Sequence, residues 1–387
     1  MAEPRFRWHP EARAFGPEGA EVHPLGEALQ PQPLPAPEPA PLALCHALAL
    51  GRGFRIGGTG AAPARGFETL TSGSTGRPRR IARGVESWTA GFAVNAGLFG
   101  LGPGRRVAVL GGLVHSLSLY GALEAMHLGA ETHLLGGLRP DRQGRALAAR
   151  RVDVVYATPA QLRGLDHPLP DLRLVLVGGS KLDPGLRAHL ARLAPGAALR
   201  EFYGAAETSF VTLADAATPA ESVGRPYPGV EIEIRAGEVW VKSPYLFDGY
   251  ALDPGEAPPL SGQARRAGDW LSVGEMGRIE GGCLYLSGRK GRMVTVADRN
   301  VFPEEIEAFL ETLPGLARAA VLAEPDARRG QRLYAVVMGD PGQEGAILAA
   351  LRARLEPLVA PRRLVWRRDW PETASGKSDL AALAKGA

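Results

Sequence analysis

The sequence predicts an α/β fold: a large N-terminal domain with parallel or mixed sheets, helices and β-hairpins, followed by a small α+β domain. Three observations predict it: the length, an alternation of strand-like and helix-like segments, and a change to hairpin-like segments after Gly224. At 387 residues the chain exceeds the roughly 250–300 residues that one hydrophobic core usually supports. We therefore expect two domains, residues 1–287 and 288–387, with the boundary near Gly288.

From Arg106 onward, short apolar runs alternate with amphipathic segments. Strands are expected over residues 106–113, 131–137, 152–159, 172–179 and 198–204. Helices are expected over residues 118–129, 142–151 and 184–193. This alternation predicts a mostly parallel sheet with helices on its faces, and ligands of such sheets bind outside the carboxyl ends of the strands.

The remaining segments predict hairpins, a compact tail and an extended arm. Hairpins are expected over residues 230–243 and over 277–289, the second turning at Gly281–Gly282. The tail is expected to contain helices over 303–313 and 346–356 and strands over 317–324, 332–339 and 362–367. Residues 31–41 carry proline at every odd position, which favours an extended connector or surface arm and forbids a helix.

Composition excludes several classes of protein. A net charge of +4 is small for this length and predicts no nucleic-acid partner. Cys45 and Cys283 form no metal-binding or disulfide pattern. The N-terminus lacks the apolar region of a signal peptide, and no apolar run approaches the ~18 residues of a spanning helix. We expect a cytoplasmic protein without a transmembrane segment.

One polar loop is suited to bind an anion. Residues 71–76 read Thr-Ser-Gly-Ser-Thr-Gly, and Arg79 and Arg80 follow. The glycines permit turns that expose backbone N–H groups, and the hydroxyls add further donors. The loop is not a Walker P-loop, and by itself its composition favours a flexible polar segment over an anion site.

Six short motifs nevertheless occur in a fixed order. They are TSGSTGRP (71–78), YGAAE (203–207), GRPYPG (224–229), GD (268–269), GRKGR (288–292) and TASGK (373–377). Together they resemble the signature series of the adenylate-forming (AMP-binding) superfamily, which includes acyl-CoA synthetases, peptide-synthetase adenylation domains and firefly-type luciferases. The resemblance extends from about residue 65 to the C-terminus. It implies a small C-terminal domain that is mobile about a hinge at residues 288–292.

The resemblance also implies an ATP site assembled from these motifs. The loop at 71–76 would wrap the β- and γ-phosphates, and Arg79 stands where the family usually has lysine. Tyr203 would stack on adenine, and Asp269 would accept hydrogen bonds from the ribose hydroxyls. The implied nucleotide-binding residues are Thr71, Ser72, Gly73, Ser74, Thr75, Gly76, Arg79, Gly179, Ser180, Tyr203, Gly204, Asp269 and Arg289.

Three further residues would carry the chemistry that the resemblance implies. Lys377 would bridge the α-phosphate and the substrate carboxylate, where a cation is needed because two anions meet. Glu207 would help to hold Mg²⁺, a hard cation that prefers oxygen ligands. His115 aligns with the residue that gates the acyl pocket, although a core histidine is an alternative. Ser116 stands where amino-acid-activating relatives have aspartate, which disfavours an α-amino acid substrate because its ammonium would be unpaired.

Some features depart from the family pattern. Only about 70 residues precede the phosphate loop, so the N-terminal region is abridged. Ala206 replaces a common threonine, and Gly291 replaces a hinge Asp or Lys. Ala297–Asp298 stands where relatives have a glycine-containing pair near the thiol tunnel, a departure that concerns the thioester-forming step and not adenylation.

The expected function is ATP-dependent activation of a carboxylic acid through an acyl-adenylate, followed by thioester formation with CoA. The apolar segments 116–126 and 154–162 favour a fatty or aromatic acid. A basic tail suits a phosphate-bearing acceptor, and its arginines are Arg362, Arg363, Arg367 and Arg368. One alternative is a stand-alone adenylation enzyme that loads the phosphopantetheine of an acyl carrier protein. Another is a catalytically silent nucleotide-binding homologue, which would have no need of Lys377.

Overall fold

The protein is described by a computed structural model and divides into two compact units. The first comprises Met1–Ile232, Val241–Leu271 and Gly281–Leu284, and the second comprises Glu233–Trp240, Ser272–Glu280 and Tyr285–Ala387. The residues that the structure describes are 5–23, 44–45, 48–49, 51, 53–57, 62–63, 65–71, 79–252, 264–296, 299–326, 330–373 and 378–385. The expected α/β fold class is confirmed, whereas the boundary near Gly288 stays a prediction. The proline-rich segment 31–41 lies outside the described residues.

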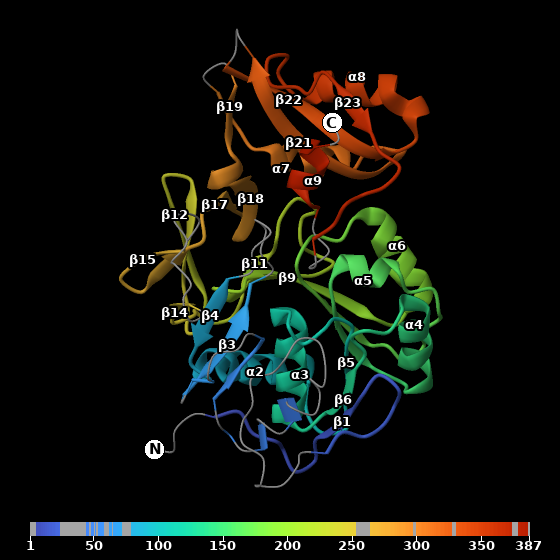
Figure 1. Ribbon diagram of the computed structural model, residues 1–387, viewed down its shortest axis with the longest axis vertical. Coiled ribbons are helices and arrows are strands. Elements are labelled where there is room, and N and C mark those ends of the chain that lie inside the picture. Colours follow the sequence, from blue (N-terminus) through green and yellow to red (C-terminus); the bar gives the residue numbers. More distant parts are fainter. Residues whose placement is uncertain are drawn as a thin grey trace. The chain divides into compact units, whose positions relative to one another are not determined.

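Among the described residues, an eight-stranded sheet forms the centre of the first unit, in the order β1-β6-β5-β7-β8-β9-β10-β11 (Figure 1). Neighbouring strands from β1 to β9 run parallel, and β10 and β11 run antiparallel to their neighbours. The strands are β1 (Arg13–Phe15), β5 (Arg106–Val109), β6 (Glu131–Leu134), β7 (Val154–Ala157), β8 (Leu174–Val177), β9 (Ala198–Ala205), β10 (Ser209–Ala214) and β11 (Arg225–Pro226). The mostly parallel sheet predicted from residues 106–204 is confirmed.

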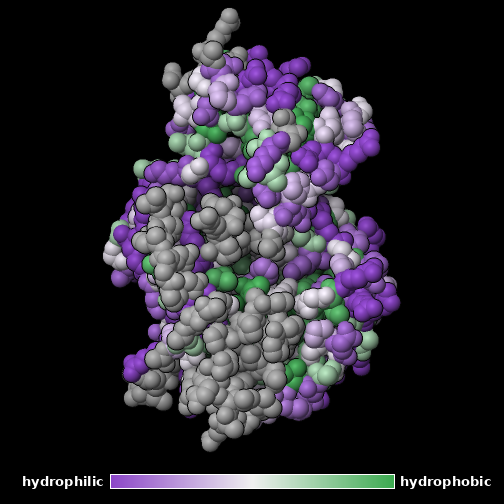
Figure 2. Space-filling view, viewed as in Figure 1, coloured by the Kyte–Doolittle hydropathy of each residue, from purple (hydrophilic) through white to green (hydrophobic). Residues whose placement is uncertain are grey.

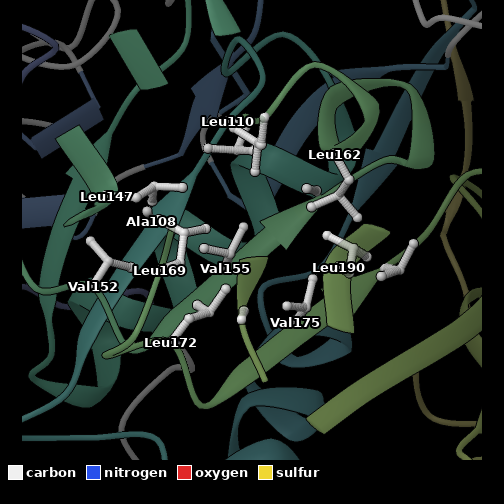
Figure 3. Packing of buried hydrophobic residues seen from close by; sticks show 14 of the residues in the cluster. Ala108, Leu110, Leu147, Val152, Val155, Leu162, Leu169, Leu172, Val175 and Leu190 are labelled. Atoms are coloured by element: carbon white, nitrogen blue, oxygen red, sulfur yellow. The ribbon is translucent and has the colours of Figure 1, made fainter. Parts of the chain in front are cut away.

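Helices cover both faces of this sheet. Val155 of β7 points into an apolar cluster with α4, α5 and α6 (Figure 3). The hydroxyl of its neighbour Tyr156 donates to Glu124 of α3, on the opposite face. The helices are α2 (Glu86–Phe99), α3 (Ser116–Leu128), α4 (Pro140–Ala149), α5 (Pro159–Arg163) and α6 (Pro184–Leu193). The side chains of successive residues in a buried strand therefore pack alternately against two separate helical layers.

Local sequence signals set the ends of these helices. Thr158 and Gln161 form a reciprocal capping box at the start of α5. Asp183 caps α6 by accepting a hydrogen bond of 2.9 Å from the backbone N–H of Leu186. Gly129 ends α3 in a left-handed conformation with φ 92°, which glycine adopts without a steric penalty.

A smaller four-stranded sheet in the first unit carries the phosphate-loop segment. Its order among the described strands is β14-β4-β3-β2. The strands are β2 (Phe54–Arg55), β3 (Phe67–Leu70), β4 (Arg80–Arg83) and β14 (Gly249–Ala251). β3 and β4 pair antiparallel, and Thr71 and Arg79, the described ends of the predicted phosphate loop, directly follow β3 and precede β4.

Two predicted hairpins are confirmed. β12 (Glu231–Arg235) pairs with β13 (Glu238–Lys242), and β17 (Glu275–Glu280) neighbours β18 (Cys283–Arg289). Gly281 and Gly282 both have positive φ, 57° and 75°, as a two-residue turn of type I′ requires. Short strands β15 (Arg265–Ala267) and β16 (Trp270–Ser272) extend the same sheet.

The tail of the second unit has the predicted α+β composition. A three-stranded sheet, β21 (Leu316–Asp326), β22 (Gly330–Gly339) and β23 (Leu364–Trp366), shares a core with α7 (Pro303–Leu310) and α8 (Glu344–Arg354). The other elements of this unit are η1 (Lys290–Arg292), β19 (Val294–Val296), β20 (Arg299–Val301), η2 (Pro341–Gln343) and α9 (Leu380–Lys385). This core is separate from that of the first unit, since the two clusters share no residue.

The outer side of the α4–α6 layer is largely hydrophilic on the face that Figure 2 shows. Within the described part of the chain, no helix combines the length and the apolar character that crossing a membrane requires.

Candidate active site

The base of the predicted phosphate loop is closed by two hydrogen bonds between Thr71 and Arg79. The backbone N–H of Thr71 donates to the carbonyl of Arg79 at 2.8 Å, and the N–H of Arg79 donates to Thr71 Oγ1 at 2.9 Å. These bonds hold together Thr71, which follows β3, and Arg79, which precedes β4. The predicted contacts Ser72, Gly73, Ser74, Thr75 and Gly76 lie outside the described residues.

Tyr250 brings Arg79 and Glu207 together. Its hydroxyl donates to Glu207 Oε1 at 3.0 Å and accepts from the N–H of Ala264 at 3.0 Å. The Arg79 Cζ lies 5.7 Å from the centre of the Tyr250 ring, within cation–π range. Burial, followed by the charge of Glu207, raises the pKa of Tyr250 to about 12. The sequence does not single out Tyr250, because it becomes a neighbour of Arg79 only through the pairing of β14 with β4.

Arg83 is a second residue that the sequence does not identify. It is 1% exposed, and its guanidinium donates to the carbonyl oxygens of Ala206 at 2.5 Å and of Tyr245 at 2.9 Å. Burial lowers its pKa to about 10, against the opposing influence of Glu207 and Asp248. Arg83 thus fixes the backbone immediately before Glu207 from inside the protein.

The turn between β9 and β10 requires glycine. A Cβ at Gly204 would lie 1.9 Å from the carbonyl oxygen of Ser209, closer than any real contact. The turn is tight enough that Ser209 itself has a positive φ of 56°. Thr208 Oγ1 accepts from the N–H of Ala205 at 2.9 Å and stabilises the turn. Tyr203, half-buried in β9, precedes this turn, and Glu207 lies within it.

The predicted adenine segments lie at the ends of adjacent strands. β8 pairs parallel with β9, so Gly179 and Ser180 leave the sheet beside the strand that carries Tyr203. Gly179 has φ 97°, and Ser180 is exposed. A Cβ at Gly178 would lie 2.3 Å from the ring of Phe202, so only glycine lets this ring pack against the end of β8.

His115 lies beside the start of the phosphate-loop segment. It precedes α3 and forms an isolated parallel bridge with Leu70, and Ser116 Oγ donates to the Leu70 carbonyl at 3.4 Å. Burial lowers the pKa of His115 below its usual 6.5, so the imidazole is neutral at pH 7. A neutral ring in this position is compatible with an apolar substrate group.

Asp269 is exposed and lines a pocket of ≈ 400 Å³ together with Phe247, Asp248 and Arg266. The backbone N–H of Phe247 donates to the carbonyl of Glu207 at 2.9 Å. The pocket of Asp269 therefore shares Phe247 with the turn that holds Glu207.

The remaining predicted residues belong to the second unit. Arg289 Nε donates to Glu275 Oε1 at 2.8 Å. Lys377 lies outside the described residues, as do Ala297 and Asp298. In the predicted basic tail, the guanidinium Nη2 of Arg363 lies 3.3 Å from the carboxylate Oε2 of Glu324. Arg367 likewise lies 3.1 Å from Asp369, so carboxylates on the same surface offset part of the positive charge.

The donor set fits Mg²⁺ held largely by a nucleotide. The described residues contain no group of three acidic, histidine or cysteine side chains that could hold a metal by themselves. Mg²⁺ is commonly bound through one or two carboxylates together with substrate phosphates and water. Glu207, which hydrogen-bonds to Tyr250 beside the predicted phosphate loop, would supply one such carboxylate.

Comparison with known proteins identifies the family. The protein-family model described as AMP-binding enzyme matches residues 69–251. The family model described as AMP-binding enzyme C-terminal domain matches residues 305–377. An uncharacterized acyl–CoA ligase, YhfT, of Bacillus subtilis is 32% identical over 334 residues, 82% of this chain and 67% of that protein. An indoleacetate–CoA ligase of Aromatoleum aromaticum is 29% identical over 337 residues, 79% of this chain and 64% of that protein.

A solved structure is similar as well. The amide bond synthetase McbA from Marinactinospora thermotolerans has a TM-score of 0.72 and 28% identity, covering 87% of this chain and 74% of that one. The chain is thus shorter than these relatives and spans about two thirds of the length of the two ligases. The expected superfamily, the two-domain α/β architecture and the class of AMP-forming acid–thiol ligases are confirmed. The chain belongs to the AMP-binding enzyme family of adenylate-forming acyl-CoA ligases.

Proposed function

We propose that this protein activates an apolar carboxylic acid with Mg·ATP and transfers the acyl group to a thiol, with CoA as the preferred acceptor. One observation carries the proposal: Arg79 and Glu207, 128 positions apart in the sequence, meet around Tyr250 at the closed base of the phosphate-loop hairpin. A cation and a carboxylate at this point suit the phosphates of ATP and the Mg²⁺ that accompanies them.

In the first step, a carboxylate oxygen of the acid attacks the α-phosphorus of ATP. The bond from the α-phosphorus to the bridging oxygen breaks, and pyrophosphate leaves with its β- and γ-phosphates on the loop between Thr71 and Arg79. Glu207 would hold Mg²⁺, which neutralises phosphate charge when bound. Lys377 would stabilise the charge that develops at the α-phosphate.

In the second step, the acceptor thiol attacks the carbonyl carbon of the acyl-adenylate. The thiol proton is released, the bond between the acyl carbon and the phosphate oxygen breaks, and AMP leaves. The names of the two ligases support CoA as the acceptor. Phosphopantetheine on a carrier protein is chemically the same thiol.

A second acceptor class is an amine, which would give an amide in place of a thioester. The likeness to an amide bond synthetase at 28% identity favours this candidate. The first step is the same in both cases, and only the nucleophile of the second step differs.

The first experiment is carboxylate-dependent ATP–pyrophosphate exchange with fatty, aromatic and amino acids. We expect exchange with fatty or aromatic acids and not with α-amino acids, because a serine and not a carboxylate stands at position 116. Addition of CoA, a phosphopantetheinylated carrier protein or an amine then identifies the product. Lack of exchange with every acid, from folded protein, would contradict the proposal.

Lys377→Ala is expected to lower exchange by at least ~10²-fold, the scale for losing one transition-state donor. Thioester formation from synthetic acyl-adenylate should change much less, since Lys377 acts on the phosphorus chemistry. Lys385→Ala, in α9, is the control and should leave both rates unchanged. Equal losses in both half-reactions of Lys377→Ala would show that its assigned role is wrong.

A further inference from the structure

Tyr250 is the side chain on which two charged groups of the proposed site meet. It lies in β14, which pairs antiparallel with β4 so that Tyr250 stands opposite Ile81 and Ala251 opposite Arg80. The same strand β4 continues from the phosphate-loop segment. The backbone therefore fixes Tyr250 to the hairpin that carries Arg79, whereas its hydroxyl reaches a different element, the β9–β10 turn.

The direction of its hydrogen bonds is determined by the partners. A phenol has one proton to donate, and its oxygen can accept. The N–H of Ala264 can only donate, so the Tyr250 oxygen accepts from it at 3.0 Å. The hydroxyl proton is then directed to Glu207 Oε1, also at 3.0 Å. This bond holds one carboxylate oxygen and leaves the second as the candidate ligand for a cation.

Tyr250 contacts two groups of opposite charge. The guanidinium of Arg79 lies over the ring, with 5.7 Å from Cζ to the ring centre, while the hydroxyl binds the carboxylate of Glu207. The rest of the Glu207 turn is fixed independently, through the bond from Arg83 to the Ala206 carbonyl and from the Phe247 N–H to the Glu207 carbonyl. Among the described residues, Tyr250 is one whose side chain hydrogen-bonds to the Glu207 side chain.

We propose that Tyr250 is a positioning residue for adenylation: it orients the Glu207 carboxylate toward Mg²⁺ and steadies Arg79 at the base of the phosphate loop. This inference rests on the proposed function. Residues that orient a metal ligand typically contribute 10- to 100-fold to metal affinity or activity. Tyr250 should therefore affect the use of Mg²⁺ and ATP, and not the binding of the acid.

The test compares Tyr250→Phe, which removes only the hydroxyl, with Tyr250→Leu, which also removes the ring. Pyrophosphate exchange is measured against MgCl₂ at fixed ATP, with the best acid of the panel. We expect Tyr250→Phe to raise the half-saturating Mg²⁺ concentration ~10-fold. The KM for the acid should not change. Tyr250→Leu should in addition raise the KM for ATP.

Tyr285→Phe is a matched control. Tyr285 is half-buried, and an arginine also lies over its ring, with Arg278 Cζ 4.7 Å from the centre. It has no place in the proposed site, so its Mg²⁺ dependence should equal that of the wild type. Thermal unfolding of each variant shows whether it is folded.

A double-mutant cycle separates positioning from a merely structural role. If Tyr250 acts through Glu207, Tyr250→Phe should have little further effect on Mg²⁺ dependence in a Glu207→Gln background. Additive effects, or a Tyr250→Phe enzyme indistinguishable from Tyr285→Phe, would overturn the inference while leaving the proposed function intact. If the wild type catalyses no exchange, the proposed function fails, and calorimetric binding of Mg·ATP decides the role of Tyr250: unchanged affinity in Tyr250→Phe overturns it.

Discussion

Glu124, in the middle of α3, is a carboxyl group without solvent exposure. It accepts hydrogen bonds from Asn95 at 2.8 Å and from the hydroxyl of Tyr156, and the hydroxyl of Tyr227 donates to Asn95 at 2.6 Å. Burial raises the pKa of Glu124 to about 8, and the hydrogen bonds only partly oppose this shift. A polar network thus occupies the space between α2, α3 and β7, and its stability depends on one proton.

Glu124→Gln should remove that proton dependence. Between pH values near 4.5 and 8 the folded wild type binds more protons than the unfolded chain, so its free energy of unfolding falls as pH rises. The stabilisation is complete below the unfolded pKa and is lost above the folded one, with a slope of at most about 1.36 kcal/mol per pH unit. Urea unfolding across this range should show a flatter profile for Glu124→Gln. The profile should remain wild-type for the exposed control Glu86→Gln, and an equal slope in both variants would refute the assignment.

At the scale of elements, the sequence predicts features that depend on neighbouring residues. It does not predict those that depend on contacts between distant segments. The buried strands β5, β7 and β8 appear as continuous apolar runs, and the glycine pair at 281–282 marks its own turn, so these could be predicted. The sequence does not predict α2, because Gly91 and Gly97 lower helix propensity. The structure explains why position 91 is glycine: a Cβ there would lie 2.5 Å from the hydroxyl of Tyr120.

The same distinction holds within the candidate site. Arg79, Glu207 and Asp269 stand in motifs that can be read along the chain. Tyr250 and Arg83 do not, because their roles arise from contacts across long sequence separations: β14 with β4, and Arg83 with the Ala206 carbonyl. Nothing in the local composition of either segment indicates these contacts.

The β9–β10 turn gives a prediction at this scale. Gly204→Ala would place a Cβ 1.9 Å from a backbone oxygen, so the turn must open, and we expect lower stability and weaker exchange activity. Gly97→Ala is the matched control, since a Cβ there meets nothing within 4 Å and alanine favours the helix by roughly 0.5–1 kcal/mol. The midpoint temperature of thermal unfolding should therefore fall for Gly204→Ala and rise for Gly97→Ala. A Gly204→Ala protein as stable and active as the wild type would contradict the constraint.

At the scale of the whole molecule, each unit has its own apolar core. Leu190 of α6, 2% exposed, belongs to the core of the first unit, and Leu310 of α7, without exposure, to that of the second. Of the residues proposed to act on the nucleotide, Arg79, Glu207 and Asp269 belong to the first unit together with Tyr250, whereas Arg289 and Lys377 belong to the second. Because most of these residues lie in the first unit, Mg·ATP should stabilise the first unit more than the second.

Calorimetry can test this separation. We expect two unfolding transitions, because each unit has a core of its own. Leu190→Ala should lower the midpoint temperature of one transition and Leu310→Ala that of the other. Each substitution should reduce the free energy of unfolding of its unit by the ~2–5 kcal/mol typical of truncating a buried leucine. Mg·ATP stabilises only what binds it, by about 2.7 kcal/mol at a hundredfold excess over Kd, so it should raise the transition that Leu190→Ala lowers. If Mg·ATP instead raised mainly the transition lowered by Leu310→Ala, the assignment of most nucleotide contacts to the first unit would be wrong. A single transition moved by both variants would mean that the two cores unfold together.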